Sequence, residues 1–133
     1  MQEVVKFLNE NINGFLATLA DGKPRVRPYQ FMLEDGGKLC FSTNNTKEVC
    51  KQLKANPSME FSCTNAQSGW LRLSGEVKFS NDIKIKEKIL AKSEVVKSIY
   101  KTPDNPTFEV FYLDHGTALI LDLPGGQPKK IDF

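Results

Sequence analysis

The stretch "FSTNNTKEVCKQL", Phe41–Leu53, begins with the composition of a β-strand and ends with that of an α-helix. Short hydroxyl and amide side chains fill the junction, and Lys47 stands where the helix is expected to begin. A helix N-terminus exposes unpaired N–H groups and a partial positive charge, so a lysine there is unfavourable unless an anion lies nearby. Two interpretations follow: a capping box formed by Asn45 and Glu48, or a binding site for an anion such as a cofactor phosphate.

The residues before this stretch alternate between apolar runs and tight turns. The turns at 21–24 and 34–37 are too short for a parallel crossover, so the strands that they join are expected to form a three-stranded antiparallel meander. The predicted elements are a helix over 2–12 and strands over 15–20, 25–33 and 38–43.

Two arginines on the second of these strands bear on the anion hypothesis. Arg25 and Arg27 are two residues apart and should therefore project from the same face of a strand. If the meander closes in register, Arg25 lies near the strand end that carries Thr43 and Lys47. Arginine's planar fork suits phosphate oxygens, so the sequence predicts that these groups converge on one anion.

The rest of the chain continues the β-rich pattern with further helices. About six to seven antiparallel strands with two to three peripheral helices indicate a mainly β protein, a closed or nearly closed β-barrel. The predicted elements are helices over about 46–55 and 81–101, and strands over 58–65, 69–80, 107–114 and 117–123.

Composition excludes several classes of function. The 133 residues suit a single domain, 1–133, with 40% hydrophobic and 26% charged residues. A net charge of +2, with the basic residues on predicted helices and turns, argues against a nucleic-acid partner. No apolar run reaches the roughly 18 residues of a membrane span or resembles a signal peptide, so we expect a cytoplasmic protein without a membrane partner.

The chain carries few side chains of catalytic or metal-binding type. Its three cysteines, Cys40, Cys50 and Cys63, lie among apolar neighbours and are expected to be buried free thiols. The sole histidine, His115, falls in a predicted tight turn, and no Cys-x-x-Cys pair occurs, so no metal site is expected. Standard enzyme signatures are absent, and no side chain is assigned a catalytic role.

The order and spacing of these pieces resemble a known family. The residues "GFLATLADGKPRVRPYQFMLEDGGKLCFSTNNTKEVCKQLKANP", followed by "GWLRLSGEVKFS", are similar to the pyridoxamine 5′-phosphate oxidase-like family of FMN-binding split barrels. The resemblance covers roughly residues 1–80 well and is looser beyond them. It is strongest to the short members grouped with the nitroimidazole-resistance reductases.

The resemblance implies FMN as the cofactor and a homodimer with FMN at the subunit interface. It assigns phosphate binding to Arg25 and Lys47, and it places Ser42 and Thr43 near the phosphate and ribityl chain. Trp70 would reach the flavin ring from the neighbouring subunit. The cofactor-binding positions expected in this way are Arg25, Val26, Arg27, Pro28, Tyr29, Gln30, Ser42, Thr43, Asn44, Lys47 and Trp70.

One departure from the family pattern limits the function that can be carried over. Pyridoxamine 5′-phosphate oxidases proper have a C-terminal tryptophan and arginines that hold the substrate, whereas here no tryptophan follows Trp70 and no arginine follows Arg72. We therefore expect an FMN-dependent oxidoreductase of an unidentified small molecule, with nitroreduction as one option. The alternatives are a non-catalytic flavin-binding or flavin-sensing protein, or a split barrel that binds a deazaflavin or haem.

Overall fold

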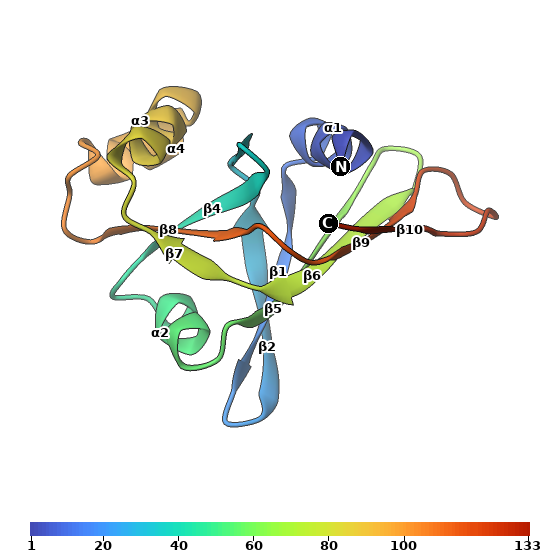
Figure 1. The fold of residues 1–133 in the computed structure, drawn as a ribbon, viewed down its shortest axis with the longest axis horizontal. Coiled ribbons are helices and arrows are strands. Elements are labelled where there is room, and N and C mark those ends of the chain that lie inside the picture. The colour runs from blue at the N-terminus through green and yellow to red at the C-terminus, as the bar shows by residue number, and fades with distance from the viewer.

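A computed structural model describes the whole chain, Met1–Phe133, as ten antiparallel strands and four helices (Figure 1). The helices are α1 (Gln2–Glu10), α2 (Glu48–Ala55), α3 (Ile83–Lys92) and α4 (Glu94–Tyr100). The strands are β1 (Asn13–Ala20), β2 (Lys23–Gln30), β3 (Leu33–Asp35), β4 (Lys38–Asn44), β5 (Ser58–Thr64), β6 (Trp70–Glu76), β7 (Lys78–Ser80), β8 (Phe108–Leu113), β9 (Thr117–Leu121) and β10 (Lys129–Asp132). The expected mainly β architecture with peripheral helices is confirmed.

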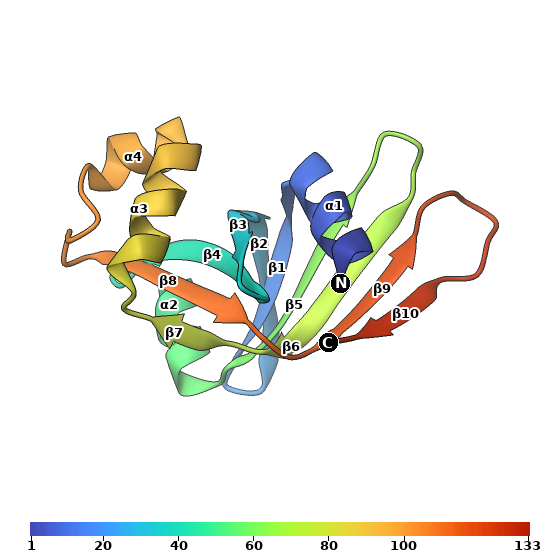
Figure 2. The ribbon, with the colours of Figure 1, turned by 45° about the horizontal axis from the view of Figure 1, so that its top comes forward.

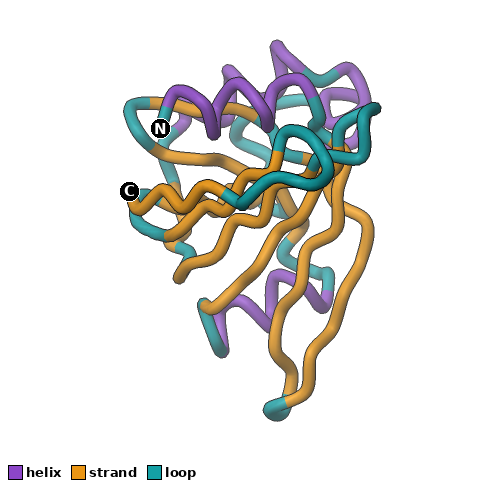
Figure 3. Tube along the Cα trace, turned by 90° about the vertical axis from the view of Figure 1, so that its right-hand side faces the viewer, coloured by secondary structure: helices purple, strands orange, loops and turns teal.

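The strands form two sheets between which the chain passes repeatedly. The larger sheet has the order β10-β9-β6-β5-β1-β2, and the smaller has the order β3-β4-β8-β7 (Figure 2). The chain changes sheet at Phe31–Met32, across the α2 segment between β4 and β5, at Val77 and at the 114–116 turn. Helix α2 lies on one side of the strands, and α1, α3 and α4 lie on the other (Figures 1 and 3).

The main core lies between the two sheets and is built on aromatic contacts. The Phe41 ring of β4 stacks on Phe111 of β8 with ring centroids 5.4 Å apart, and it meets Phe61 of β5 edge-on at 5.2 Å. Every second residue of β5 and β6 points into this core, as the period of a strand requires. A second cluster fills the space under α3 and α4, where Tyr100 stacks on Phe108 at 4.5 Å.

The predicted three-stranded meander is wrong at its centre. The expected strand 25–33 divides at Phe31–Met32 because these two residues are buried and bond to different partners. The Phe31 N–H donates to Ile12 O, whereas the Met32 N–H donates to Cys40 O. The chain therefore leaves β2 and begins β3 in the other sheet, so β2 pairs with β1 alone and never with β4.

Two further breaks and one additional strand explain why the structure has more elements than the sequence predicted. The expected strand 69–80 divides at Val77, where the chain changes sheet. The expected helix 81–101 divides at Ser93, whose Oγ accepts from the Val96 N–H and caps α4. The tail adds β10, which pairs with β9.

None of the four helices has the length and hydropathy that crossing a bilayer requires.

Candidate functional site

The pairing of β2 with β1 sorts the predicted site residues onto two faces of the sheet. Arg25 stands opposite Thr18, and Arg27 stands opposite Leu16. Directly paired residues share a face, so the two arginines lie on the face that also carries buried Leu16 and Thr18. Their predicted common face is confirmed, and Tyr29 shares it. The opposite face of β2 carries Val26, Pro28 and Gln30.

Arg27 joins β2 to α2 through a closed set of hydrogen bonds, the Arg27–Thr18–Gln52 network. Its Nη1 donates to Thr18 Oγ1 at 2.8 Å and to Leu16 O at 3.3 Å, and its Nη2 donates to Gln52 Oε1 at 2.7 Å. Thr18 Oγ1 donates to the same Gln52 oxygen at 2.6 Å. Partial burial lowers the pKa of the Arg27 guanidinium below its ordinary value. Sequence reasoning gave no indication of Gln52.

Tyr29 joins β2 to β4, which no backbone pairing does. Its hydroxyl donates to Ser42 O at 2.6 Å, and its ring packs against Phe41 and Phe111. Burial raises the pKa of Tyr29 far above its ordinary value. Tyr29 is therefore a neutral bridge that holds β2 beside the end of β4.

The entrance of α2 lacks a side-chain cap, so the predicted capping box of Asn45 and Glu48 is wrong. Residue Lys47 occupies the N-cap position and makes no capping bond. Asn45 instead donates through Nδ2 to Pro106 O, and its N–H donates to Thr107 O. Glu48 lies 3.6 Å from the Lys51 ammonium. The N–H groups of the first turn of α2 are consequently free to bind another group.

Asn44, which was expected to contact the cofactor, is occupied within its own turn. Its Oδ1 accepts from the N–H of Thr46 at 2.9 Å and from the hydroxyl of Thr46 at 2.8 Å. This Asx turn orders the approach to α2 without using the helix amides.

A cavity of about 150 Å³ lies where β2, the end of β4 and the entrance of α2 meet α4. We call it the Thr43–Lys47 cavity. Thr43 is only 3% exposed, and its Oγ1 is buried without a hydrogen-bond partner. Lys47 is exposed and has no carboxylate within ion-pair distance. The cavity is lined by Tyr29, Gln30, Met32, Ser42, Thr43, Lys47, Val96, Ile99 and Tyr100.

A second cavity, of about 270 Å³, shares the residues Gln30 and Met32 with the first. Its walls are mostly apolar. The Lys92 ammonium lies at its edge, where it donates to Met32 O at 2.6 Å, and partial burial lowers the pKa of Lys92. The remaining lining residues are Ile12, Phe31, Ser93, Glu94 and Val95. The Thr43–Lys47 cavity, which should attract an anion, therefore adjoins a larger cavity with mostly apolar walls.

The remaining predicted residues lie outside the Thr43–Lys47 cavity. Arg25 is exposed, and its one hydrogen bond runs from Nη1 to Pro24 O at 3.0 Å. Trp70 lies under the Arg72 guanidinium, 4.7 Å from it, and it lines none of the cavities described. The structure thus groups Tyr29, Gln30, Ser42, Thr43 and Lys47, and adds apolar α4 residues that no sequence motif marked.

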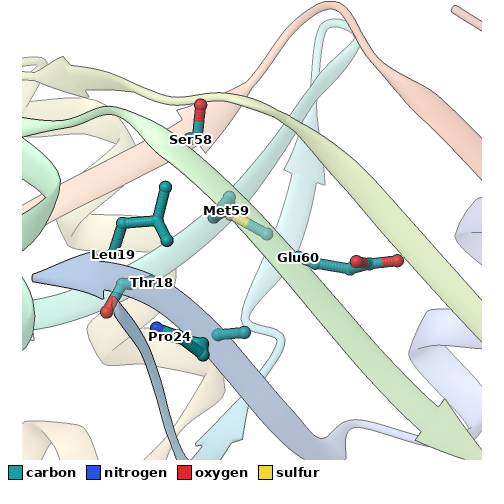
Figure 4. A pocket seen from close by; sticks show the side chains of 7 residues that line it. Thr18, Leu19, Pro24, Ser58, Met59 and Glu60 are labelled. Atoms are coloured by element: carbon teal, nitrogen blue, oxygen red, sulfur yellow. The ribbon is translucent and has the colours of Figure 1, made fainter. Parts of the chain in front are cut away.

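The larger sheet has an apolar outer face, which points away from the core. Phe15 and Val26 are 58% and 69% exposed, and the β-strand register places Trp70 and Arg72 on the same face. A hollow of about 240 Å³ indents this face beside Met59 and Pro24 (Figure 4). Its one charged lining residue is Glu60, so it offers nothing that attracts an anion.

The thiols and the histidine take no part in either cavity. All three cysteines are buried and free, as expected, and burial raises the pKa of Cys40 and of Cys63 to about 12. His115 lies exposed between β8 and β9, where Nδ1 is 2.9 Å from Asp114 Oδ1. No group of three or more His, Cys, Asp or Glu side chains is arranged to hold a metal ion.

Comparison with solved structures identifies several proteins that share this fold. A NimC/NimA family protein from Clostridium acetobutylicum is 34% identical with a TM-score of 0.91, covering 100% of this chain and 92% of that chain. A heme binding protein from Mycobacterium smegmatis is 18% identical with a TM-score of 0.74, covering 93% and 54%. An F420 reductase is 20% identical with a TM-score of 0.60, covering 93% and 91%. The last two similarities concern the fold alone.

These similarities define the protein as a split barrel, the class that the sequence resemblance implied. The family model described as pyridoxamine 5′-phosphate oxidase matches residues 1–118. The chain belongs to the pyridoxamine 5′-phosphate oxidase-like family. A search of curated proteins finds no match.

Proposed function

We propose that the protein binds FMN in the Thr43–Lys47 cavity and acts as an oxidoreductase on a small molecule. The observation that carries this proposal is the Thr43 hydroxyl, which is buried without a partner in the cavity wall. Buried polar groups in native proteins are nearly always hydrogen-bonded, so an orphaned hydroxyl in a cavity wall points to a ligand. Lys47 and the uncapped first turn of α2 give that ligand the chemistry of an anion.

The residues present fit the phosphate of FMN. Thr43 Oγ1, the Lys47 ammonium and the free amides of α2 would donate to its oxygens. Tyr29 and Gln30 would lie along the rest of the cofactor. Bound FMN supplies the redox chemistry, whereas the protein supplies binding and orientation.

The neighbouring cavity offers room for the substrate. It adjoins the cofactor cavity through Gln30 and Met32, and its walls are mainly apolar. A small molecule with an apolar body fits these walls. The sequence resemblance to the nitroimidazole-resistance reductases makes a nitroaromatic compound the first substrate to test.

We propose a homodimer joined through the outer face of the larger sheet. Phe15 and Val26 expose large apolar side chains on this face, which is typical of a surface covered by a partner. The same face carries both Glu60 and Arg72. In a two-fold arrangement the same patch of each copy covers the other, so opposite charges on one patch can pair across the interface. Trp70, which lies outside its own cofactor cavity, would then be free to approach the partner's flavin.

The decisive experiment identifies the ligand. The purified protein should show the visible absorption of an oxidised flavin, or acquire it on addition of FMN, and mass spectrometry of the released ligand should give the mass of FMN. If the released ligand has the mass of a deazaflavin, the conclusion would be that the same anion site binds that cofactor in place of FMN. A Soret band would indicate haem, for which the exposed His115 provides no ligand inside a cavity. If the purified protein does not bind added FMN, the proposal is refuted.

Catalysis and simple flavin binding differ in their kinetics. With NADH or NADPH as donor and a nitroaromatic acceptor, an enzyme should cycle the flavin at a rate that depends on acceptor concentration. A flavin that binds tightly but is neither reduced by any donor nor reoxidised by any acceptor would favour the flavin-sensing alternative.

A further inference from the structure

Helix α4 carries two apolar side chains, Val95 and Ile99, that the fold leaves uncovered, and we call them the α4 stripe. They are 66% and 57% exposed and lie one helical turn apart on the same face of α4. The buried residues of α4, Val96 and Tyr100, hold the helix against the second core cluster. Val95 and Ile99 contribute little to that packing, so the fold alone does not explain their apolar character.

The α4 stripe borders both cavities of the site. Ile99 lines the Thr43–Lys47 cavity, and Val95 lines the neighbouring cavity of about 270 Å³, which we call the Val95 cavity. The two cavities also share Gln30 and Met32, so the stripe runs alongside adjoining spaces. A molecule bound in the Val95 cavity would therefore cover Val95 and lie next to a cofactor in the other cavity.

The polar side chains of the Val95 cavity are largely committed within the fold. The Lys92 ammonium donates to Met32 O at 2.6 Å and to Asn9 Oδ1 at 3.2 Å. The Ser93 hydroxyl accepts from the Val96 N–H and so caps α4. A ligand in this cavity consequently meets mainly apolar groups that are free to contact it.

The charges that border the Val95 cavity are of opposite sign. One cation, Lys92, and one carboxylate, Glu94, line it, so it has no net charge that would attract an anion or a cation. An ion that entered would lose hydration without a charged partner of its own, which is unfavourable. The volume lies below the roughly 300–1,000 Å³ of pockets for drug-sized ligands, so a molecule of a single ring suits it.

We propose that Val95 is a specificity-determining residue and that the substrate is a small uncharged aromatic compound. This inference rests on the proposed function, because it takes the Val95 cavity as the place of the substrate beside FMN. A flat aromatic ring presents apolar surface to Val95, and a nitro group on that ring would supply the reducible group. The competing explanation is that a second copy of this chain covers the α4 stripe.

The substitution Val95→Ala removes two methyl groups from the α4 stripe. Because Val95 is mostly exposed and alanine favours a helix, the melting temperature should stay the same or rise. The Kd of the FMN-loaded protein for nitrobenzene, measured from the change in flavin absorption, should rise about three- to tenfold because the ligand loses apolar contacts. The Kd for FMN, measured by flavin fluorescence, should change by less than about twofold, since Val95 does not line the Thr43–Lys47 cavity.

Probes of different charge test the proposed substrate class. Nitrobenzene should bind the FMN-loaded wild-type protein at least about fivefold more tightly than either 4-nitrobenzoate or protonated 4-nitrobenzylamine. Ile83→Ala is the matched control, because Ile83 is an apolar residue of α3 that is 43% exposed and lines neither cavity. It should leave the Kd for nitrobenzene within about twofold of wild type.

The outcomes separate a failure of this inference from a failure of the proposed function. A protein that does not bind FMN would overturn the proposed function and this inference with it. An FMN-loaded protein would overturn this inference alone if Val95→Ala left the Kd for nitrobenzene unchanged, or if 4-nitrobenzoate bound as tightly as nitrobenzene. A dimer that dissociates on Val95→Ala, with a lower mass in sedimentation equilibrium, would show that a second copy covers the α4 stripe and would also overturn it.

Discussion

Replacement of Thr43 by valine should stabilise the ligand-free protein and weaken its binding of FMN. Valine has nearly the shape of threonine and is equally suited to a β-strand, so the substitution removes little but the hydroxyl. That hydroxyl is buried and unpartnered in the ligand-free fold. The same group would donate to the phosphate in the complex, so one change is expected to move stability and affinity in opposite directions.

The magnitudes follow from the two environments of Thr43 Oγ1. An unsatisfied buried hydroxyl costs about 1–3 kcal/mol, so the free energy of unfolding should rise by about 1 kcal/mol or more. For a protein of 133 residues this corresponds to a rise of roughly 3–5 °C in melting temperature. Loss of one hydrogen bond to a charged phosphate costs about 1.5–3 kcal/mol, which weakens FMN binding by roughly 10- to 150-fold.

Thr18→Val is the matched control. Thr18 is buried to the same 3% exposure, but its hydroxyl is bonded to both Gln52 and Arg27. Its loss should therefore lower the free energy of unfolding by about 1–3 kcal/mol. The measurements are urea unfolding of the ligand-free proteins and titration with FMN monitored by flavin fluorescence. A Thr43→Val protein destabilised as much as Thr18→Val, or one with unchanged FMN affinity, would contradict the assignment of the cavity.

Three other outcomes are expected. Lys47→Ala should weaken FMN binding by about 1.5–3 kcal/mol and leave riboflavin binding unchanged, as measured by calorimetric titration, whereas Arg25→Ala, which changes a residue outside the cavity, should weaken FMN binding less; unchanged FMN affinity in Lys47→Ala would refute the phosphate assignment. Val26→Asp should convert a dimer into a monomer of 15.0 kDa in sedimentation equilibrium, and an unchanged mass would place the interface elsewhere. Hydrogen bonds from His115 and Lys78 lower the pKa of Asp114 to about 2. Because that folded pKa lies below the ordinary value, the associated stability is present above about pH 4 and is lost as pH falls to 2, so the urea midpoints of wild type and Asp114→Asn should converge at pH 2.

The sequence was sufficient to predict those features of the structure that depend only on residues close together in the chain. Asp21 and Gly22 both have positive φ, 52° and 74°, which is the two-residue hairpin turn that an Asp-Gly pair favours. The register of β1 against β2, and hence the common face of the two arginines, could be predicted from it. The burial of all three thiols followed in the same way from their apolar neighbours.

The change of sheet at Phe31–Met32 could not be predicted from the residues around it. No glycine or other turn residue separates the run "FML" from the strand before it, so its pattern does not differ from that of an unbroken strand. The bend is set by acceptors remote in the chain, Ile12 O for one residue and Cys40 O for the next. This error carried over to the site, because Tyr29 rather than Arg25 is the residue of β2 that reaches Ser42.

The site shows the same division between local and remote signals. Lys47 was identified because a cation at a helix entrance conflicts with the helix dipole, and that reasoning needs no tertiary information. The commitment of Arg27 to Gln52 depends on α2 packing against β1 and β2, and a glutamine on an exposed helix carries no signal of it. The α4 residues Val96 and Ile99 are apolar positions of an ordinary amphipathic pattern until the fold brings them to the cavity.

The local conflicts at this cavity favour a ligand over a purely structural junction. Asn44 and Asn45 are both good capping residues near the entrance of α2, yet one bonds within its own turn and the other bonds to the loop before β8. An unused cap costs about 1 kcal/mol, and the orphaned hydroxyl of Thr43 costs about as much again. A junction shaped only by folding would be expected to resolve at least one of these conflicts, since each needs a single side-chain acceptor or donor. Both conflicts persist beside the same cavity, with an unpaired lysine next to them, and a phosphate would resolve all three at once.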